Sequence, residues 1–458
     1  MGGALSASLF ARHALLPQGW RRDVLLEWDA AGDLTAVAEN AAPPAGAAVA
    51  EYVLPGMVNL HSHAFQRALG GMTEVAGDGP DSFWTWRELM YRFARHITPE
   101  QMEAIAAQLF AECLRHGYTA VCEFHYLQRD MAGALYARPA ETAQRVLAAA
   151  RVSGIGVTML PVLYSHAGFG EQPLKPEQAR FRTSADDVLR IVEALAPQRG
   201  GQVEVGFAPH SLRAAGVEQI REVAQALPAD RPIHIHIAEQ QGEVRQSLDY
   251  SGRRPVQYLY EQLDVDARWC LVHATHVQPD EVALMSASGA VAGLCPTTEA
   301  NLGDGLFPLA EFIAAGGRFG VGSDSHVSQS PVEELRWLEY GQRLQRQQRN
   351  VAATPEQRHV GDYLWQAALQ GGAQASGRKL GALAPGCRAD VLVLDDAHVN
   401  LCGVAIADVL GSFIFCGNDK LVRDVLCGGQ WQVRDGRHVA QDAIATAYKR
   451  TLAQLRAL

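Results

Sequence analysis

Lysine is scarce in this chain of 458 residues: only four of its 40 basic residues are lysines, and the others are arginines. Cysteine is also rare, with eight residues and no Cys-x-x-Cys pair, which favours reduced thiols and a cytoplasmic protein. The chain has no run of 18 apolar residues, and its first 20 residues lack a basic segment followed by a long apolar core. These two absences argue against a membrane span and a signal peptide.

Common cofactor and zinc-protease motifs are missing as well. There is no Gly-x-Gly-x-x-Gly, no phosphate-binding loop of the Walker type and no His-Glu-x-x-His, so the sequence offers no site of these kinds. The 50 acidic residues exceed the basic ones and give a net charge of −10. Such a surface repels phosphate backbones, and we expect no nucleic-acid partner. With 48% hydrophobic residues, the composition is that of a globular protein with a large core.

The middle of the chain alternates between short apolar runs and longer amphipathic segments. The apolar runs are residues 54–60, 119–124, 156–162, 203–208, 232–237, 268–272, 290–294 and 318–321. Runs this apolar are typical of parallel strands that are buried on both faces, and helices between them make βα units. Eight such units predict an α/β fold with a closed, TIM-like (β/α)8 barrel, whose active site lies at the carboxyl ends of the strands. An open, doubly wound sheet is the alternative, but such a sheet does not require eight units.

The two ends of the chain show a different pattern, with short alternating strands and turn signals in residues 4–53 and 381–438. Neither end has enough strands to be stable alone. We therefore expect residues 1–53 and 381–458 to form one small β-sandwich domain, and residues 54–380 to form the barrel. The long loops at 64–97 and 164–183 are expected to bind substrate or to cover it.

Polar residues stand at the ends of four predicted strands. His61 and His63 follow the first strand, His236 the fifth, His273 the sixth and Asp324 the eighth. Two histidines at positions i and i+2 point to the same side of an extended chain. Because the carboxyl ends of all barrel strands meet at one face, we expect these side chains to converge on a metal ion.

The type and number of these groups predict one ion. The imidazoles of His61, His63 and His236 would be three ligands, the carboxylate of Asp324 would be the fourth, and a position would be left for water. Such a ligand set suits zinc, with iron(II) as the second choice. A binuclear site in a barrel of this kind normally needs a lysine on the fourth strand to bridge the metals. The only lysine between His63 and His236 is Lys175, which lies in a loop.

Motifs along the whole chain carry a family resemblance. They are Pro55-Gly56-Met57 before His61-Ser62-His63, His236-x-x-Glu239, His273, Ser323-Asp324-Ser325 and the segment 381–390. With these motifs the chain resembles the amidohydrolase superfamily, specifically its aminohydrolase, or deaminase, branch. Within that branch it is similar to the iminohydrolases that act on N-formimino-L-glutamate in histidine degradation. The segments with this closer similarity are 59–69, 81–91, 122–126, 163–170, 235–240, 272–276, 298–305 and 322–341.

The resemblance implies a metal-dependent enzyme that hydrolyses a formimino group and releases N-formyl-L-glutamate and ammonia. A bound metal ion makes hydroxide available at neutral pH, and Asp324 can accept the proton of the attacking water. Glu239 is not needed as a ligand and can hydrogen-bond the formimino nitrogens. His273 can orient or deprotonate the water and stabilise charge in the tetrahedral intermediate. The resemblance also suggests a homodimer.

A substrate with two carboxylates needs fixed cations in a net-acidic protein. Arginine suits this role because its planar guanidinium matches a carboxylate. The candidates are Arg87 and Arg213, the second of which lies just past the fourth strand. The resemblance supports both and adds Gln66, Tyr126 and His210 as neutral hydrogen-bonding partners.

Two other functions remain open at this point. A related aminohydrolase that acts on a nucleobase, an adenosyl thioether or a triazine would keep the metal ligands. It would line its pocket with aromatic and amide groups rather than two arginines. The chain could also be an inactive barrel that serves as a scaffold, although the intact set of histidines and carboxylates argues against such decay.

Overall fold

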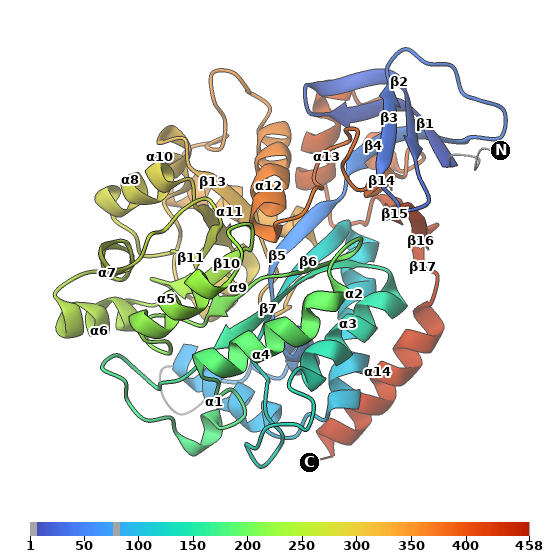
Figure 1. Cartoon of the computed structure of the whole chain (residues 1–458). Helices are drawn as coiled ribbons and strands as arrows, with labels where there is room; N and C mark the ends of the chain where they lie inside the picture. Colours follow the sequence, from blue (N-terminus) through green and yellow to red (C-terminus); the bar gives the residue numbers. More distant parts are fainter. Residues whose placement is uncertain (1–6, 77–82, 458) are drawn as a thin grey trace.

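The structure is a computed structural model that describes residues 7–76 and 83–457 (Figure 1). It has an α/β fold in which the apolar runs of the middle region form two parallel sheets. The strands of the first sheet are β5 (Met57–Ser62), β6 (Tyr118–His125), β7 (Gly156–Leu163) and β8 (Val203–Val205), with the short β9 (Ala208–Pro209) beside β7. Those of the second are β10 (Ile233–Ile237), β11 (Trp269–His273), β12 (Val291–Leu294) and β13 (Arg318–Val321). The expected α/β class with parallel strands is confirmed.

The two parallel sheets adjoin at both of their edges. A parallel bridge joins Phe207 to Ile233, and a second joins Ser62 to Asp324. At the second edge the backbone N–H of Asp324 donates to the carbonyl of His61 over 2.9 Å. His61 and Asp324 are more than 250 residues apart in the sequence. They are nevertheless hydrogen-bonded neighbours at the carboxyl ends of β5 and β13.

Helices follow the strands along the chain and cover the parallel sheets. They are α2 (Pro99–His116), α3 (Glu141–Ser153), α4 (Ala185–Leu195), α5 (Val217–Ala226), α6 (Gln241–Ser251), α7 (Pro255–Gln262), α8 (Pro279–Ser288), α9 (Pro296–Leu302), α10 (Leu309–Ala314), α11 (Pro331–Arg346) and α12 (Val360–Ser376). The start of α2 is a capping box: the Thr98 hydroxyl accepts from the backbone N–H of Gln101, whose side chain accepts from the N–H of Thr98. No helix within the described ranges is long and apolar enough to cross a membrane.

The predicted long loop at residues 64–97 contains a helix. Residues 77–82 lie outside the described ranges, and they include Asp81 and Ser82 of the similarity segment 81–91. The helix that follows them is α1 (Phe83–Ala94). The segment is rich in aromatic residues, and its buried side chains include Met90, Tyr91 and Phe93. Packing of this apolar side therefore makes a helix where the sequence pattern favoured a loop.

Strands from both chain ends form one further sheet, which lies at the upper right of Figure 1. In spatial order its strands are β17 (Arg437–His438), β16 (Gln430–Arg434), β15 (Val422–Cys427), β14 (Val391–Leu394), β4 (Ala48–Pro55), β1 (Ala7–Leu16), β2 (Gly19–Trp28) and β3 (Leu34–Ala38). The sheet curls over its own core, because Trp28 Nε1 donates to the carbonyl of Gly429 over 3.1 Å and Asp33 pairs with Arg388. The expected sandwich is thus one continuous sheet. Helices α13 (Val409–Phe415) and α14 (Gln441–Arg456) belong to the same end of the chain.

The predicted strand at residues 54–60 is divided between the two parts of the fold. Strand β4 ends at Pro55 and pairs with β14, whereas β5 begins at Met57 and pairs with β6. Only Gly56 lies between them. Its backbone N–H donates to the carbonyl of Asp390 over 3.0 Å, and an added Cβ atom would lie 2.3 Å from the side chain of Thr119. Residue 56 therefore has no room for a side chain.

We expect Gly56→Ala to lower the free energy of unfolding by roughly 1–3 kcal/mol, because the methyl group overpacks a buried junction. Denaturant unfolding would measure this loss. Gly411→Ala is a matched control: an added Cβ at Gly411, in helix α13, meets no atom within 4 Å, so its stability should stay unchanged or rise slightly. Equal stabilities of the two variants would contradict the close approach at Gly56.

Candidate metal centre and substrate pocket

The four residues predicted as metal ligands meet at the carboxyl ends of the parallel strands. One ligand atom from each of His61, His63, His236 and Asp324 lies within 4.8 Å of all the others, and all four residues are buried. The Nε2 atom of His61 is 3.1 Å from that of His63 and 2.9 Å from that of His236. Oδ1 of Asp324 is 3.2 Å from Nε2 of His63. The bridge between β5 and residue 324 brings the first and last of these segments together.

Backbone carbonyls determine which nitrogen of two histidines faces the cluster. Nδ1 of His63 lies 2.9 Å from the carbonyl oxygen of Phe124, and Nδ1 of His236 lies 3.0 Å from that of His210. A carbonyl oxygen can only accept, so each Nδ1 carries the hydrogen and each Nε2 keeps a lone pair. Lone pairs this close repel one another unless a cation lies between them. The donor set therefore fits a metal ion, and three nitrogens with one carboxylate oxygen suit zinc.

The charge states of the ligands agree with a metal-binding site. Burial lowers the pKa of His61 to about 3 and that of His236 well below its ordinary value. Burial alone would raise the pKa of Asp324, but its contacts with His61 and His63 hold it well below the usual range. His61 and His236 are thus neutral imidazoles and Asp324 is an ionised carboxylate, which are the forms that bind metal.

The backbone is strained where these strands end. Positive φ angles occur at Ala238 (50°), His273 (68°), Ala274 (48°), Asp324 (45°) and His326 (64°). Non-glycine residues adopt this conformation only when the surrounding structure holds them in it, and they concentrate at functional sites. Two of the residues in this conformation, His273 and Asp324, belong to the site itself.

The three residues predicted as catalytic lie next to one another. Nε2 of His273 is 3.9 Å from Oε1 of Glu239 and 3.8 Å from Oδ2 of Asp324. Burial would lower the pKa of His273, but Glu239, Glu299 and Asp324 together raise it to about 10. Burial raises the pKa of Glu239, which makes proton uptake by this carboxylate easier.

Glu299 is a buried residue near the site that sequence reasoning missed. Its Oε1 atom accepts from the backbone N–H of Cys295 over 2.9 Å and lies 3.2 Å from Nδ1 of His273. His273, Cys295 and Glu299 could themselves hold a metal by distance, but burial raises the pKa of the Cys295 thiol well above its ordinary value. The group is better explained as a hydrogen-bonded support that orients His273.

Glu123 is a second missed residue, at the end of β6. It accepts a hydrogen bond from the Ser62 hydroxyl over 2.6 Å and another from the backbone N–H of Ala64 over 2.8 Å. These bonds lie on either side of His63 and hold the chain around it. Burial raises the pKa of Glu123 to about 7. A single glutamate in an apolar run gave no local signal for this role.

An inner cavity opens directly over the cluster, and all five residues predicted to bind substrate line it. They are Gln66, Arg87, Tyr126, His210 and Arg213. Gln66 donates to the hydroxyl of Tyr126 over 2.7 Å, while its own carbonyl oxygen is buried without a partner among the described residues. Glu239, His273 and Asp324 line the same cavity. The metal cluster and the two arginines therefore face one enclosed space.

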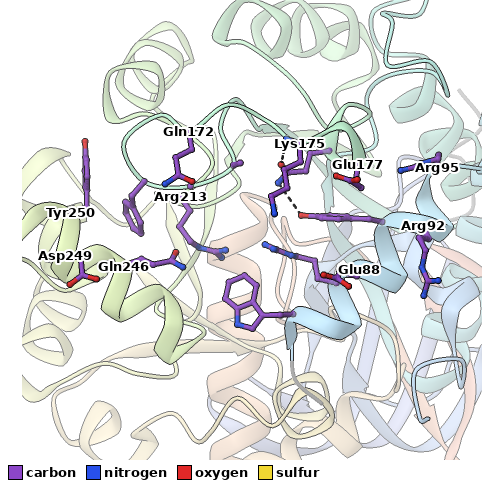
Figure 2. A pocket seen from close by; sticks show the side chains of 17 residues that line it. Glu88, Arg92, Arg95, Gln172, Lys175, Glu177, Arg213, Gln246, Asp249 and Tyr250 are labelled. Atoms are coloured by element: carbon purple, nitrogen blue, oxygen red, sulfur yellow. Dashed lines mark hydrogen bonds between the residues drawn. The ribbon is translucent and has the colours of Figure 1, made fainter. Parts of the chain in front are cut away.

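A larger outer cavity of about 1060 Å³ adjoins the inner one. Arg87, Tyr91 and Arg213 line both cavities, so the two arginines lie at the boundary between them. Figure 2 shows the side chains of Arg213 and Lys175 pointing toward the middle of the outer cavity. The guanidinium of Arg87 lies 4.5 Å from the ring centre of Trp84, a cation–π contact that holds it in place.

Comparison with known proteins agrees with this geometry. Residues 52–432 match the model of the amidohydrolase family. The chain is 53% identical over 450 residues to the formimidoylglutamate deiminase of Pseudomonas aeruginosa, a match that covers 98% of this chain and 99% of that protein. A crystal structure of an amidohydrolase from Brucella melitensis, 43% identical, superposes with a TM-score of 0.93 over 98% of this chain and 99% of that one. A zinc-bound adenosine deaminase from Xanthomonas campestris shares the fold at 20% identity, with a TM-score of 0.82 over 99% of both chains. The chain belongs to the amidohydrolase family.

Proposed function

We propose that the protein hydrolyses N-formimino-L-glutamate to N-formyl-L-glutamate and ammonia. One observation carries this proposal: the inner cavity is lined by metal ligands with Glu239 and also by Arg87 and Arg213, and only the arginines reach the outer cavity. The substrate has a matching polarity, with a basic formimino group at one end and two carboxylates at the other. The 53% identity to a protein named formimidoylglutamate deiminase supports the same reaction.

We further propose that the two parallel sheets form a closed (β/α)8 barrel over residues 54–380 and that the chain ends form the small β-domain. The parallel bridges at both sheet edges support closure, since an open sheet has two unpaired edges. We propose one zinc ion at His61, His63, His236 and Asp324, because the convergent lone pairs and the single carboxylate suit that ion. The homodimer and the cytoplasmic location stay predictions.

Asp324, Glu239 and His273 have separate roles in the proposed reaction. A zinc ion in the cluster would lower the pKa of a water molecule toward neutrality. Asp324, ionised and itself a member of the cluster, accepts a proton from the attacking water and keeps the oxygen of that water in line with the formimino carbon. Glu239 hydrogen-bonds the formimino nitrogens and carries a proton to the nitrogen that departs. His273, held by Glu299, lies between these two carboxylates and stabilises negative charge that develops on the oxygen.

The bonds balance without any further reactant. The oxygen of water forms a bond to the formimino carbon, and the bond from that carbon to the terminal nitrogen breaks. The two protons of water join the one hydrogen of the neutral imino nitrogen, which leaves as ammonia. The other nitrogen stays attached to the glutamate moiety, so the product is a formamide.

The first experiment is ammonia release by zinc-loaded protein from N-formimino-L-glutamate, with an adenosyl thioether and guanine as parallel substrates. We expect release from the formimino compound alone, because only that substrate places carboxylates on Arg87 and Arg213. Release from a purine alone would keep the metal chemistry but overturn the role of the arginines. Protein that binds no zinc and releases no ammonia would favour the inactive scaffold.

We expect Asp324→Asn to abolish turnover, because the amide can neither accept the water's proton nor provide a charged ligand. The fold should remain, since an amide of the same shape replaces a carboxylate, and circular dichroism would check this. Zinc content would be measured alongside the rate of ammonia release. Turnover within tenfold of the parent enzyme would rule out the proposed proton acceptor.

We expect Arg213→Met to weaken recognition of the substrate by about 2 kcal/mol or more, measured as kcat/KM, because a buried carboxylate would lose a charged partner. Arg221→Met is the matched control, since Arg221 is on the exposed side of α5 and pairs with Glu218. It removes the same charge and should leave kcat/KM unchanged. Equal kcat/KM values for the two variants would remove Arg213 from the binding site.

A further inference from the structure

Glu243, in the first turn of α6, is a buried carboxylate that none of the proposed steps uses. Its side chain is fully buried, at 0% exposure, and lines neither cavity. A buried carboxylate is costly unless its charge and its lone pairs are compensated. The partners of its two oxygens therefore indicate what the residue does.

One oxygen of Glu243 is bound to the backbone of a proposed catalytic residue. Oε2 accepts from the N–H of Glu239 over 3.1 Å. This bond spans the entry to α6, where Ala238 has a φ of 50°. It holds the peptide of Glu239 at the end of β10, next to His273. This part of the role is a helix-capping contact, which a neutral acceptor could also provide.

The other oxygen of Glu243 faces the arginine proposed to bind substrate. Oε1 lies 3.9 Å from Nε of Arg213, and both atoms are buried without a hydrogen-bond partner among the described residues. Arg213 is itself only 7% exposed. Among the described residues the terminal nitrogens of this guanidinium have no hydrogen bond, and Arg213 lines both cavities, so these nitrogens are left for a ligand. Figure 2 shows Arg213 beside Gln246, which lies one turn further along α6 than Glu243.

We infer that Glu243 is a positioning residue that sets the orientation of Arg213 for a substrate carboxylate and ties it to the backbone of Glu239. This inference rests on the proposed function. The negative charge of Glu243 compensates the buried guanidinium when no substrate is present. The same side chain fixes the distance between the carboxylate-binding end and the reacting end of the cavity, which selects dicarboxylates of one length.

The variant Glu243→Gln separates the two contacts. The amide oxygen can still accept from the N–H of Glu239, which leaves the NH2 group facing the Nε–H of Arg213. Two donors then oppose each other and the charge is lost, so Arg213 turns away while the helix start is kept. We expect KM for N-formimino-L-glutamate to rise about tenfold or more, as for loss of a charged partner, and kcat to change less than threefold.

Helix α8 offers a matched control. Glu281 also lies in a first turn at 0% exposure, and its Oε2 atom accepts both from the backbone N–H of Gln278 over 2.9 Å and from Nε of Arg254 over 2.7 Å. It lines neither of the two cavities. Glu281→Gln therefore removes the same charge at the same kind of helix start, but its amide oxygen can keep both bonds. We expect it to lower the melting temperature less than Glu243→Gln does, with KM unchanged.

The decisive measurement is a double-mutant cycle. In the Arg213→Met background, Glu243→Gln should raise KM less than twofold, because the residue that it positions is gone. It should also raise the melting temperature of Arg213→Met, since it neutralises a carboxylate left buried without its cation. This stability readout tests the coupling even if Glu243→Gln alone does not fold.

An unchanged KM in Glu243→Gln, or an equal rise of KM in both backgrounds, would overturn the inference while leaving the proposed function intact. No stability coupling between positions 213 and 243 would overturn it as well. Absence of turnover by the wild-type enzyme would overturn the proposed function and this inference with it.

Discussion

The structure depends on one electrostatic constraint, the convergence of three imidazole nitrogens and a carboxylate in a buried space. Nε2 of His61 lies about 3 Å from the same atoms of His63 and His236. Hydrogen bonds from Nδ1 to backbone carbonyls leave His63 and His236 with lone pairs directed inward. A metal ion that joins these inward-facing lone pairs would compensate them in the buried space. The strained turns at the strand ends hold these ligand atoms in place. The hydrogen bonds that Glu123 accepts at the end of β5 do the same.

Charge is separated along the cavity, and this explains how a chain with a net charge of −10 can bind a dianion. Net charge describes the surface and the long-range field, whereas recognition depends on the few groups that face the ligand at low dielectric. Arg87 and Arg213 line both the inner and the outer cavity, whereas Glu239 and Asp324 line the inner one alone. The arginines are compensated locally, by the Trp84 ring in one case and by Glu243 in the other. A free cavity of this kind carries little uncompensated charge before the substrate enters.

Much of the fold and the metal cluster could be predicted because both follow from periodic patterns. Apolar runs at regular spacing indicated the parallel strands, although the run 203–208 is divided between β8 and β9. Histidines or aspartate at the strand ends, such as His61 and Asp324, indicated a shared face. The division of β4 from β5 at Gly56 could not be predicted, because the apolar run continues across it and only the contact with Thr119 requires the glycine. Glu299 was missed for a similar reason. One acidic residue in a helix has no pattern, and its role comes from the proximity of His273.

Glu243 and Glu281 show what local sequence can predict about a buried glutamate and what it cannot. Each occupies the first turn of a helix, is fully buried and accepts a backbone N–H, so local rules predict a capping role for both. The difference between them is the arginine that each one faces. Arg254 donates a 2.7 Å hydrogen bond to Glu281 and is satisfied by it, whereas Arg213 remains 3.9 Å from Glu243 with its Nε unpaired. An arginine held near its partner but not saturated by it can still bind a ligand. Function in this pocket therefore arises from an ion pair that the fold leaves incomplete, a property of the tertiary structure that has no counterpart in the sequence of either helix.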